Sequence, residues 1–325
     1  MQFLGIDVSK AKLDCLWLRD PENSKIKTKI FQNTLEGHIT LKKWIETNIQ
    51  ESPENIHIIM EATGIYHESL AHHLFAQGFK VSVVNPARPK AFAKGLGSIH
   101  KNDKKDSYIL ALYGCRMTPI AWKPEPIEIR ELKALTARLE ALEDDLRRET
   151  NRLEKSEFSP VSELVIDSLR KMIKGLKAEK KRLENEINDH IDRFPHLKKD
   201  RLLLETIPGI GPVMSRLMLM VIHSRDFKKA SQVAAFLGLI PVQNESGVFK
   251  GCSRLSKAGS GKIRCKLYMA AVVSWKYNPD LISQKNRLMA NGKTTMQALG
   301  ASMRKLVQIC FGVIKNQTEY QPRVE

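Results

Sequence analysis

Four acidic residues in the first third of the chain are suited to metal-assisted chemistry. Asp7 lies inside an apolar opening run, and Glu61 ends a second apolar run over residues 56–60. Asp103 and Asp106 are three residues apart where a helical pattern begins, so both project from one helix face. Converging carboxylates repel one another unless they are protonated or bridged by cations. We therefore expect this tetrad to bind Mg²⁺, or alternatively Mn²⁺, and to act on a phosphodiester.

The overall charge indicates a polyanionic partner. Among 325 residues, 53 Lys and Arg stand against 36 Asp and Glu, which gives a net charge of +17. The basic residues are spread over several segments, which favours nucleic acid over a membrane surface. No apolar run approaches the ~20 residues that cross a bilayer. The five cysteines form no CxxC pattern, so a cytoplasmic protein with reduced thiols is expected, without a zinc site or a membrane anchor.

Each acid taken alone has a plainer interpretation. An Asp after a short strand is often a turn or cap residue, and Glu61 could cap the segment that begins at Ala62. The order of strand with acid, second strand with acid, and helix with two acids favours metal binding instead. It is the acid layout of a ribonuclease-H-like fold.

The elements that must position these acids are typical of an α/β domain over residues 1–124. Alternation and apolar runs predict an antiparallel start followed by strand–helix units. Strands are expected over 3–8, 12–18, 25–31, 56–60 and 80–84, and helices over 35–48, near 67–77 and from about 104 to 116.

A helical hairpin is expected over residues 125–195, after a proline-containing linker. Leucines recur at 3-4-3-4-7 spacing from Leu132 to Leu153, and a second apolar series runs from Leu169 to Ile191. Ser159-Pro160 breaks the pattern between them. An antiparallel coiled coil for spacing or dimerisation fits this pattern, and a helical bundle packed on the first domain fits it equally well.

The third expected domain, residues 196–325, is mainly helical. An apolar helix, the turn containing Gly209 and Gly211, and a helix from Val213 resemble a helix-hairpin-helix. Such glycines let backbone N–H groups approach a phosphate at a helix N-terminus. An ordinary turn between two helices also uses glycine.

A basic segment rich in glycine and serine follows, with no Asp or Glu between Glu245 and Asp280. A solvated charged face would normally mix signs, so this bias indicates contacts with a nucleic-acid backbone. Chemistry alone does not choose a nucleophile among the serines, because a hydroxyl needs activation. The candidate contact residues are Lys250, Arg254, Lys257, Lys262 and Arg264.

Six motifs in order across essentially the whole chain resemble the DEDD insertion-sequence transposases, a family that includes the Piv/MooV DNA invertases. They are Gly5-Ile6-Asp7-Val8-Ser9-Lys10, Met60-Glu61-Ala62-Thr63-Gly64, Asn85-Pro86, Lys101-Asn102-Asp103-Lys104-Lys105-Asp106, Ile207-Pro208-Gly209-Ile210-Gly211 and Glu245-Ser246-Gly247.

The resemblance implies a RuvC-like domain whose tetrad is Asp7, Glu61, Asp103 and Asp106, and a C-terminal transposase domain whose essential serine is Ser246. It further implies a structured noncoding RNA that pairs with donor and target DNA, and a dimer or tetramer. One departure is Lys250, where many relatives have arginine. Lysine lacks the bidentate fork, so phosphate contact there would differ.

We therefore expect a DNA transposase that cleaves and exchanges strands with metal ions and a serine nucleophile. The alternative is a RuvC-like nuclease or Holliday-junction resolvase without a serine intermediate. An actin-like kinase or ATPase also opens with Gly-Ile-Asp but needs a later Asp-x-Gly phosphate loop, where this chain has Glu61-Ala62-Thr63-Gly64. A non-enzymatic nucleic-acid-binding protein would leave the strand acids without a purpose.

Overall fold

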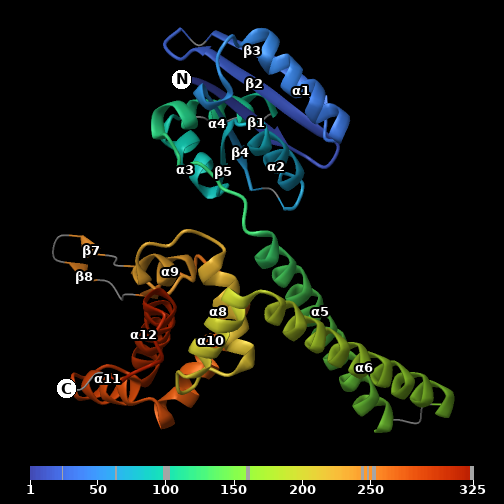
Figure 1. Cartoon of the computed structure of the whole chain (residues 1–325), viewed down its shortest axis with the longest axis vertical. Helices are drawn as coiled ribbons and strands as arrows, with labels where there is room; N and C mark the ends of the chain where they lie inside the picture. The colour runs from blue at the N-terminus through green and yellow to red at the C-terminus, as the bar shows by residue number, and fades with distance from the viewer. Residues whose placement is uncertain are drawn as a thin grey trace. The chain divides into compact units, whose positions relative to one another are not determined.

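The alternating apolar runs near the N-terminus form a mixed sheet in the computed structural model of the chain (Figure 1). β1 pairs antiparallel with β2 and parallel with β4, while β2 pairs antiparallel with β3 and β4 pairs parallel with β5. The described strands of this sheet lie in the order β3 (Lys25–Gln32), β2 (Lys12–Asp20), β1 (Gln2–Val8), β4 (Ile56–Glu61) and β5 (Lys80–Val84).

The chain divides into two units, Met1–Pro124 and Glu125–Glu325, and each is described by itself. For residues 103, 104, 245, 246, 249 and 250 only the backbone is described. None of the described helices is long and apolar enough to span a membrane. The structure describes residues 1–23, 25–62, 64–97, 103–158, 162–242, 245–246, 249–250 and 254–322.

Helices cover both faces of the sheet. α1 (Leu35–Asn48) and α2 (Glu68–Ala76) pack on the face that carries Leu4, Ile6 and Val8 of β1. α4 (Asp103–Met117) packs on the opposite face, where Leu110 and Tyr113 meet Ile59 and Phe3. α3 (Ala87–Gly95) lies beside α4, and a single 3₁₀ turn, Pro53–Asn55, precedes β4. The central strands of the sheet are therefore buried between two helical layers, whereas β3 is mostly exposed.

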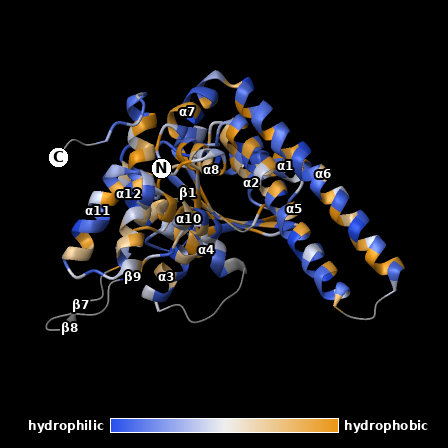
Figure 2. Cartoon of the chain, turned by 90° about the horizontal axis from the view of Figure 1, so that it is seen from below, coloured by the Kyte–Doolittle hydropathy of each residue, from blue (hydrophilic) through white to orange (hydrophobic). Residues whose placement is uncertain are grey.

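Two long helices open the second unit. α5 (Ile127–Glu157) and α6 (Glu163–Arg193) pack side by side along their length. Ion pairs join the end of α5 to the start of α6 and the middle of each helix to the other, so the helices run antiparallel. Figure 2 shows hydrophobic stripes on otherwise hydrophilic helices. The first turns of α5 and the last turns of α6 join the core of the following helices, so the hairpin and these helices form one unit.

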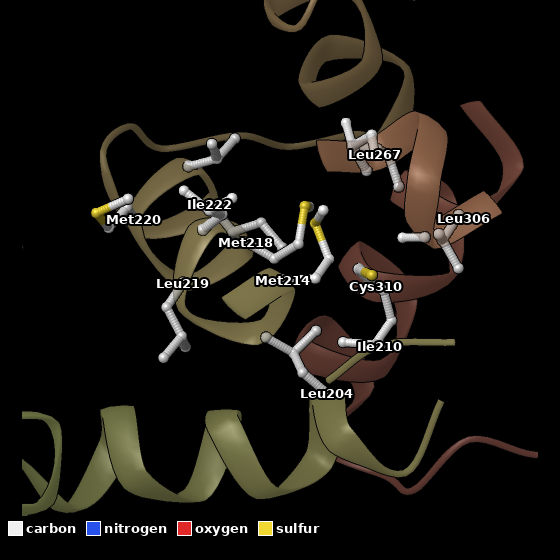
Figure 3. Close-up of a cluster of buried hydrophobic side chains, with 14 of the residues drawn as sticks. Leu204, Ile210, Met214, Met218, Leu219, Met220, Ile222, Leu267, Leu306 and Cys310 are labelled. Atoms are coloured by element: carbon white, nitrogen blue, oxygen red, sulfur yellow. The ribbon is translucent and has the colours of Figure 1, made fainter. Parts of the chain in front are cut away.

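The rest of the second unit is mainly helical around α8, which is buried on nearly all sides (Figure 3). Met214 and Met218 of α8 lie near Cys310 of α12, and Ile210 packs into the same core. This mostly apolar helix therefore forms the centre of the unit. The described helices after the hairpin are α7 (Pro195–Glu205), α8 (Pro212–His223), α9 (Ala230–Phe236), α10 (Gly261–Tyr277), α11 (Pro279–Ala290) and α12 (Thr295–Asn316).

The predicted class, mixed α/β followed by a mainly helical part, is confirmed. The expected elements of residues 1–124 are present, whereas α3, α9 and α11 were not expected. The basic segment contains two short strand pairs that the sequence analysis did not predict. β6 (Pro241–Val242) pairs with β9 (Arg254–Leu255), and β7 (Glu245–Ser246) pairs with β8 (Phe249–Lys250). Strands of two residues are too short to leave a periodic signal in the sequence.

Candidate active site

Asp7 and Glu61 lie side by side at the carboxyl ends of two parallel strands. The register of β1 and β4 pairs Ile6 with Met60, and the two acids are the next residue on each strand. Ile6 and Met60 both face the core under α1 and α2. Because successive strand residues alternate between faces, both acids project to the face that α4 covers.

α4 brings further acids to the same end of the sheet. A Cβ atom at Gly5 would lie 1.9 Å from the carbonyl oxygen of Ser107, so the helix crosses β1 in backbone contact there. Seven residues later, Gly114 lies beside the Phe3 ring, and a Cβ atom at this position would lie 3.4 Å from Phe3 Cδ1. α4 therefore runs antiparallel to β1. Asp106, one residue before Ser107, lies toward the Asp7 end of the strand.

The donors fit a hard divalent cation, because carboxylate oxygens are the ligands that Mg²⁺ and Mn²⁺ take in proteins. Asp7, Glu61 and Asp106 are each half-buried. Asp103 is the first residue of α4, but its side chain lies outside the described residues. Among the side chains that are described, no three His, Cys, Asp or Glu are grouped closely enough to hold a metal ion. The backbone therefore places these residues at the same end of the sheet. The role of the four acids as metal ligands stays a prediction.

Asp7 and Glu61, side by side on neighbouring strands, form an acid row, and a fifth carboxylate that the sequence analysis did not single out lies next to it. Asp14 of β2 is the register partner of Asp7, and its side chain is buried. The ammonium of Lys12, on the same strand and face, lies 3.1 Å from Asp14 Oδ2. Only the register of the β1–β2 pair reveals this neighbourhood, since an isolated Lys-x-Asp in a strand carries no signal of its own.

Two buried histidines lie on β4 and α1. His57, four residues before Glu61, is fully buried and shares a hydrogen bond of 2.8 Å with Ser82 Oγ. Burial, together with nearby Lys80, lowers the pKa of His57 to about 4. Burial and the charge of His73 also lower the pKa of His38. Both imidazoles are therefore neutral at pH 7, and neither contributes positive charge beside the acids.

Ser246 belongs to the second unit and lies in β7, opposite Phe249 of β8. Its side chain lies outside the described residues, as does that of Lys250, which pairs with Glu245 in the same ladder. β6 precedes and β9 follows the β7–β8 pair along the chain, and these two strands also pair with each other. Ser246 therefore lies on a two-stranded ribbon formed by β7 and β8. A ribbon presents its residues in fixed register, which an irregular loop does not.

The predicted nucleic-acid contacts near the ribbon have different surroundings. Arg254 and Lys257 are exposed, and Lys257 adopts a left-handed φ of 54°. Arg264 Nη1 donates to the carbonyl oxygen of Gly259 at 2.6 Å and to that of Leu237 at 3.4 Å. Arg264 therefore connects the segment before β6 with the segment after β9, at the base of the ribbon.

Lys262 is engaged with the hairpin. Its ammonium lies 3.5 Å from Glu140 and 3.6 Å from Asp144 of α5, and Lys266 lies 3.0 Å from the same Glu140. The start of α10 is thereby linked both to α5 and, through Arg264, to the base of the ribbon.

The turn before α8 packs against α10. Gly209 has a φ of 98°, and a Cβ atom there would lie 1.9 Å from Ser274 Oγ, so no other residue fits without rearrangement. Ser274 Oγ also donates to the carbonyl oxygen of Pro208 at 3.1 Å. Gly211 is exposed and is the N-cap residue of α8. The predicted phosphate contacts of Gly209 and Gly211 stay predictions.

Comparison with protein families gives two matches. Residues 4–156 match a family described as "Transposase", and residues 201–285 match a second family described as "Transposase IS116/IS110/IS902 family". The first match spans the acid row and most of α5, and the second spans the ribbon with Ser246.

Individual relatives agree with these matches. The chain is 31% identical to a "Pilin gene-inverting protein" of Moraxella lacunata, over 99% of this chain and 98% of the relative. It has the same identity and coverage with the protein of that name from Moraxella bovis. It is also 25% identical to a "Probable family 20 transposase" of Pseudomonas aeruginosa, over 50% of this chain and 48% of the relative.

Proposed function

Because the chain belongs to the IS116/IS110/IS902 family of transposases, we propose that it cleaves and exchanges DNA strands with the N-terminal acids and a serine nucleophile. As a member of this family it is a DNA transposase or recombinase. The observation that carries the proposal is that Asp7 and Glu61 are adjacent in register at the carboxyl ends of β1 and β4, and that α4 brings Asp106 to the same end of the sheet.

The N-terminal unit is proposed to have a RuvC-like, ribonuclease-H-like fold. Three antiparallel strands followed by two parallel strands, with acids at the carboxyl ends of β1 and β4, support this assignment. In open sheets of this kind, functional groups gather at the carboxyl ends of parallel strands.

The residues that would hold Mg²⁺ or Mn²⁺ are Asp7, Glu61, Asp103 and Asp106. Bound there, a divalent cation supplies charge neutralisation and Lewis-acid polarisation at the scissile phosphate. Several acids are needed because each carboxylate oxygen offsets only part of the cation's charge. The strands and α4 would hold these ligands in place before the cation binds.

Ser246 is the proposed nucleophile. Its Oγ forms a bond to phosphorus while the bond from phosphorus to the 3′ oxygen breaks. The serine proton leaves, and the departing 3′ oxygen gains a proton, which gives a phosphoserine and a free 3′-hydroxyl. Attack by a partner strand's 3′-hydroxyl on this phosphoserine would release the serine and restore a phosphodiester, so the exchange needs no external energy source.

Basic residues around the ribbon are proposed to contact the DNA backbone. Arg254 and Lys257 are exposed beside the ribbon and are the strongest candidates. Lys250, Lys262 and Arg264 complete the proposed set, together with the backbone of Gly209 and Gly211 in a helix-hairpin-helix. Lys262 and Arg264 would need to exchange their present partners for phosphate.

A structured noncoding RNA that pairs with donor and target DNA is the proposed guide, and the α5–α6 hairpin is the proposed coiled-coil spacer or dimer contact. Purification in high salt from cells that carry the native flanking DNA, followed by sequencing of bound RNA, tests the guide. One discrete RNA encoded beside the gene is expected. A heterogeneous mixture removed by salt would contradict it and favour non-specific charge binding.

Strand cleavage tests the acid row. DNA with the element's own end is incubated with Mg²⁺, Mn²⁺ or EDTA, together with any copurifying RNA. Glu61→Gln is expected to abolish cleavage, whereas Glu51→Gln, an exposed acid before β4, is expected to leave it unchanged. Cleavage in EDTA, or full activity of Glu61→Gln, would contradict the proposal. Cleavage that yields free ends only, without attachment to protein, would favour the nuclease or junction resolvase.

A further inference from the structure

A lysine–aspartate pair lies next to the acid row on the neighbouring strand. Asp14 is the register partner of Asp7, and residues paired across a sheet point to the same face. Asp14 therefore joins the row formed by Asp7 and Glu61 on the face that α4 covers. The Lys12 ammonium lies 3.1 Å from Asp14 Oδ2, with 45% of the lysine side chain exposed and 9% of the aspartate.

Packing alone gives no reason for this pair. Like charges directly opposite each other destabilise a sheet, and a buried position beside Asp7 would ordinarily hold an apolar residue. Leu16 and Leu18 fill the following positions of β2 on the same face, against Ala111 of α4. At the position opposite Asp7, β2 carries Asp14 instead of an apolar residue, and Asp14 binds the Lys12 ammonium.

The turn that carries Lys12 is tightly fixed. The Ser9 hydroxyl donates to the Lys12 carbonyl oxygen at 2.9 Å and accepts from the Lys12 N–H at 3.1 Å. Asn33 Nδ2 donates to the Ser9 carbonyl oxygen at 2.9 Å and to that of Tyr66 at 3.0 Å. The segments that follow Asp7 and Glu61 are thus joined through one amide, which is itself bonded to buried His38. These bonds fix the backbone of Lys12, and the contact with Asp14 positions its ammonium.

We infer that Lys12 is a further catalytic residue, whose ammonium contacts a non-bridging oxygen of the scissile phosphate, and that Asp14 is the residue that positions it. The inference rests on the proposed strand cleavage at the acid row. Lysine acts as a compact point charge with three donors, so it can bond Asp14 and a phosphate oxygen together. A cation fixed beside the reacting phosphate stabilises the negative charge that develops in the transition state.

Four variants test the inference in metal-dependent cleavage of element-end DNA. Lys12→Gln should lower the cleavage rate about 100-fold. Lys12→Arg should retain most of the rate, because it keeps the charge. Asp14→Asn should fall between them, because the lysine remains but is no longer held. Lys43→Gln is the matched control, since it removes one exposed lysine from α1, on the opposite face of the sheet.

Two readouts separate contact with phosphate from a structural role. Sulfur in place of the contacted non-bridging oxygen should slow the wild-type protein and Lys43→Gln, but should slow Lys12→Gln several-fold less. Binding of Mn²⁺ to the free protein should become tighter in Lys12→Gln, because a positive charge near the cation site is lost. A rate loss with an unchanged sulfur effect and unchanged Mn²⁺ affinity would overturn the inference.

A protein without a role for Lys12 and a protein without metal-dependent cleavage would give different results. Metal-dependent wild-type cleavage that Lys12→Gln fully retains would overturn only the role of Lys12. Metal-independent cleavage by the wild-type protein would overturn the proposed function and this inference with it. Equal losses of rate in Lys12→Gln and Lys43→Gln would indicate a general charge effect and would also overturn the inference.

Discussion

Gly5 of β1 and Ser107 of α4 touch backbone to backbone: a Cβ atom at position 5 would lie 1.9 Å from the Ser107 carbonyl oxygen. This contact fixes how closely α4 approaches the sheet and how far along β1 it lies. The distance from Asp7 to Asp106 therefore depends on the absence of a side chain two residues before Asp7.

Gly5→Ala is expected to displace α4 and to lower the free energy of unfolding by about 3 kcal/mol, because the obstructing atoms belong to the backbone. Urea unfolding measures the loss, and hydrogen exchange should show faster opening of α4 amides. Gly175→Ala is the control, since no atom lies within 4 Å of a Cβ there. This substitution should slightly increase the stability of α6, because alanine favours helix more than glycine does. Equal stability of the two variants would contradict the contact.

Acid should destabilise the protein through His57. Its pKa is about 4 in the folded state and about 6.5 when exposed, so below pH 6.5 the unfolded chain binds a proton that the folded chain does not. The stability present above pH 6.5 is lost on acidification, by about 3 kcal/mol at pH 4. Urea unfolding between pH 7 and pH 4 measures this loss. His57→Gln should flatten the profile, and an unchanged slope would show that other groups cause it.

The Glu140–Lys266 contact should couple the hairpin to α10. The two side chains are 20% and 29% exposed and 3.0 Å apart, so a double-mutant cycle with Glu140→Gln and Lys266→Gln should give about 0.5–1 kcal/mol. The Asp167–Lys171 pair on α6 is more exposed, at 58% and 77%, and its cycle should give about 0.3 kcal/mol. A larger coupling in the control pair would refute a linking role for Glu140.

Mixing inactive variants tests whether the acids and the serine of different protomers cooperate. Asp7→Asn and Ser246→Ala are each expected to be inactive in strand exchange. If one protomer supplies the acids and another the serine, the mixture should recover about a quarter to a half of the wild-type activity. No recovery, in mixtures shown to co-assemble, would place both groups on one protomer.

The sequence predicted the N-terminal sheet because alternating and apolar strands leave a clear period, and it placed Asp7 inside the first strand and Glu61 at the end of a later one. It missed α3, which contains Pro89 and has no side-chain cap, and α9, which spans seven residues. α11 was also missed, although Asn278 and the proline after it are start signals that the sequence does contain.

The neighbourhood of Asp14 and Asp7 was beyond sequence reasoning for a different reason. It depends on the register of two strands, and neither residue carries a local signal of the other. The same holds for Arg264, whose run of basic neighbours suggested phosphate contact but whose guanidinium bonds two carbonyl groups at the base of the ribbon. Basic residues that are close in sequence suggest one phosphate-binding surface. In the fold, however, Arg264 and Lys262 bind partners from other segments of the chain.

Covalent trapping on nicked element-end DNA that prevents religation tests the serine nucleophile most directly. With Mg²⁺ and any copurifying RNA, the wild-type protein should form an adduct that survives denaturation, and mass spectrometry should place the DNA on Ser246. Glu61→Gln and Ser246→Ala should form none, while Ser256→Ala should form it normally. An adduct that persists in Ser246→Ala, or cleavage without any adduct, would contradict a serine nucleophile activated by the acid row.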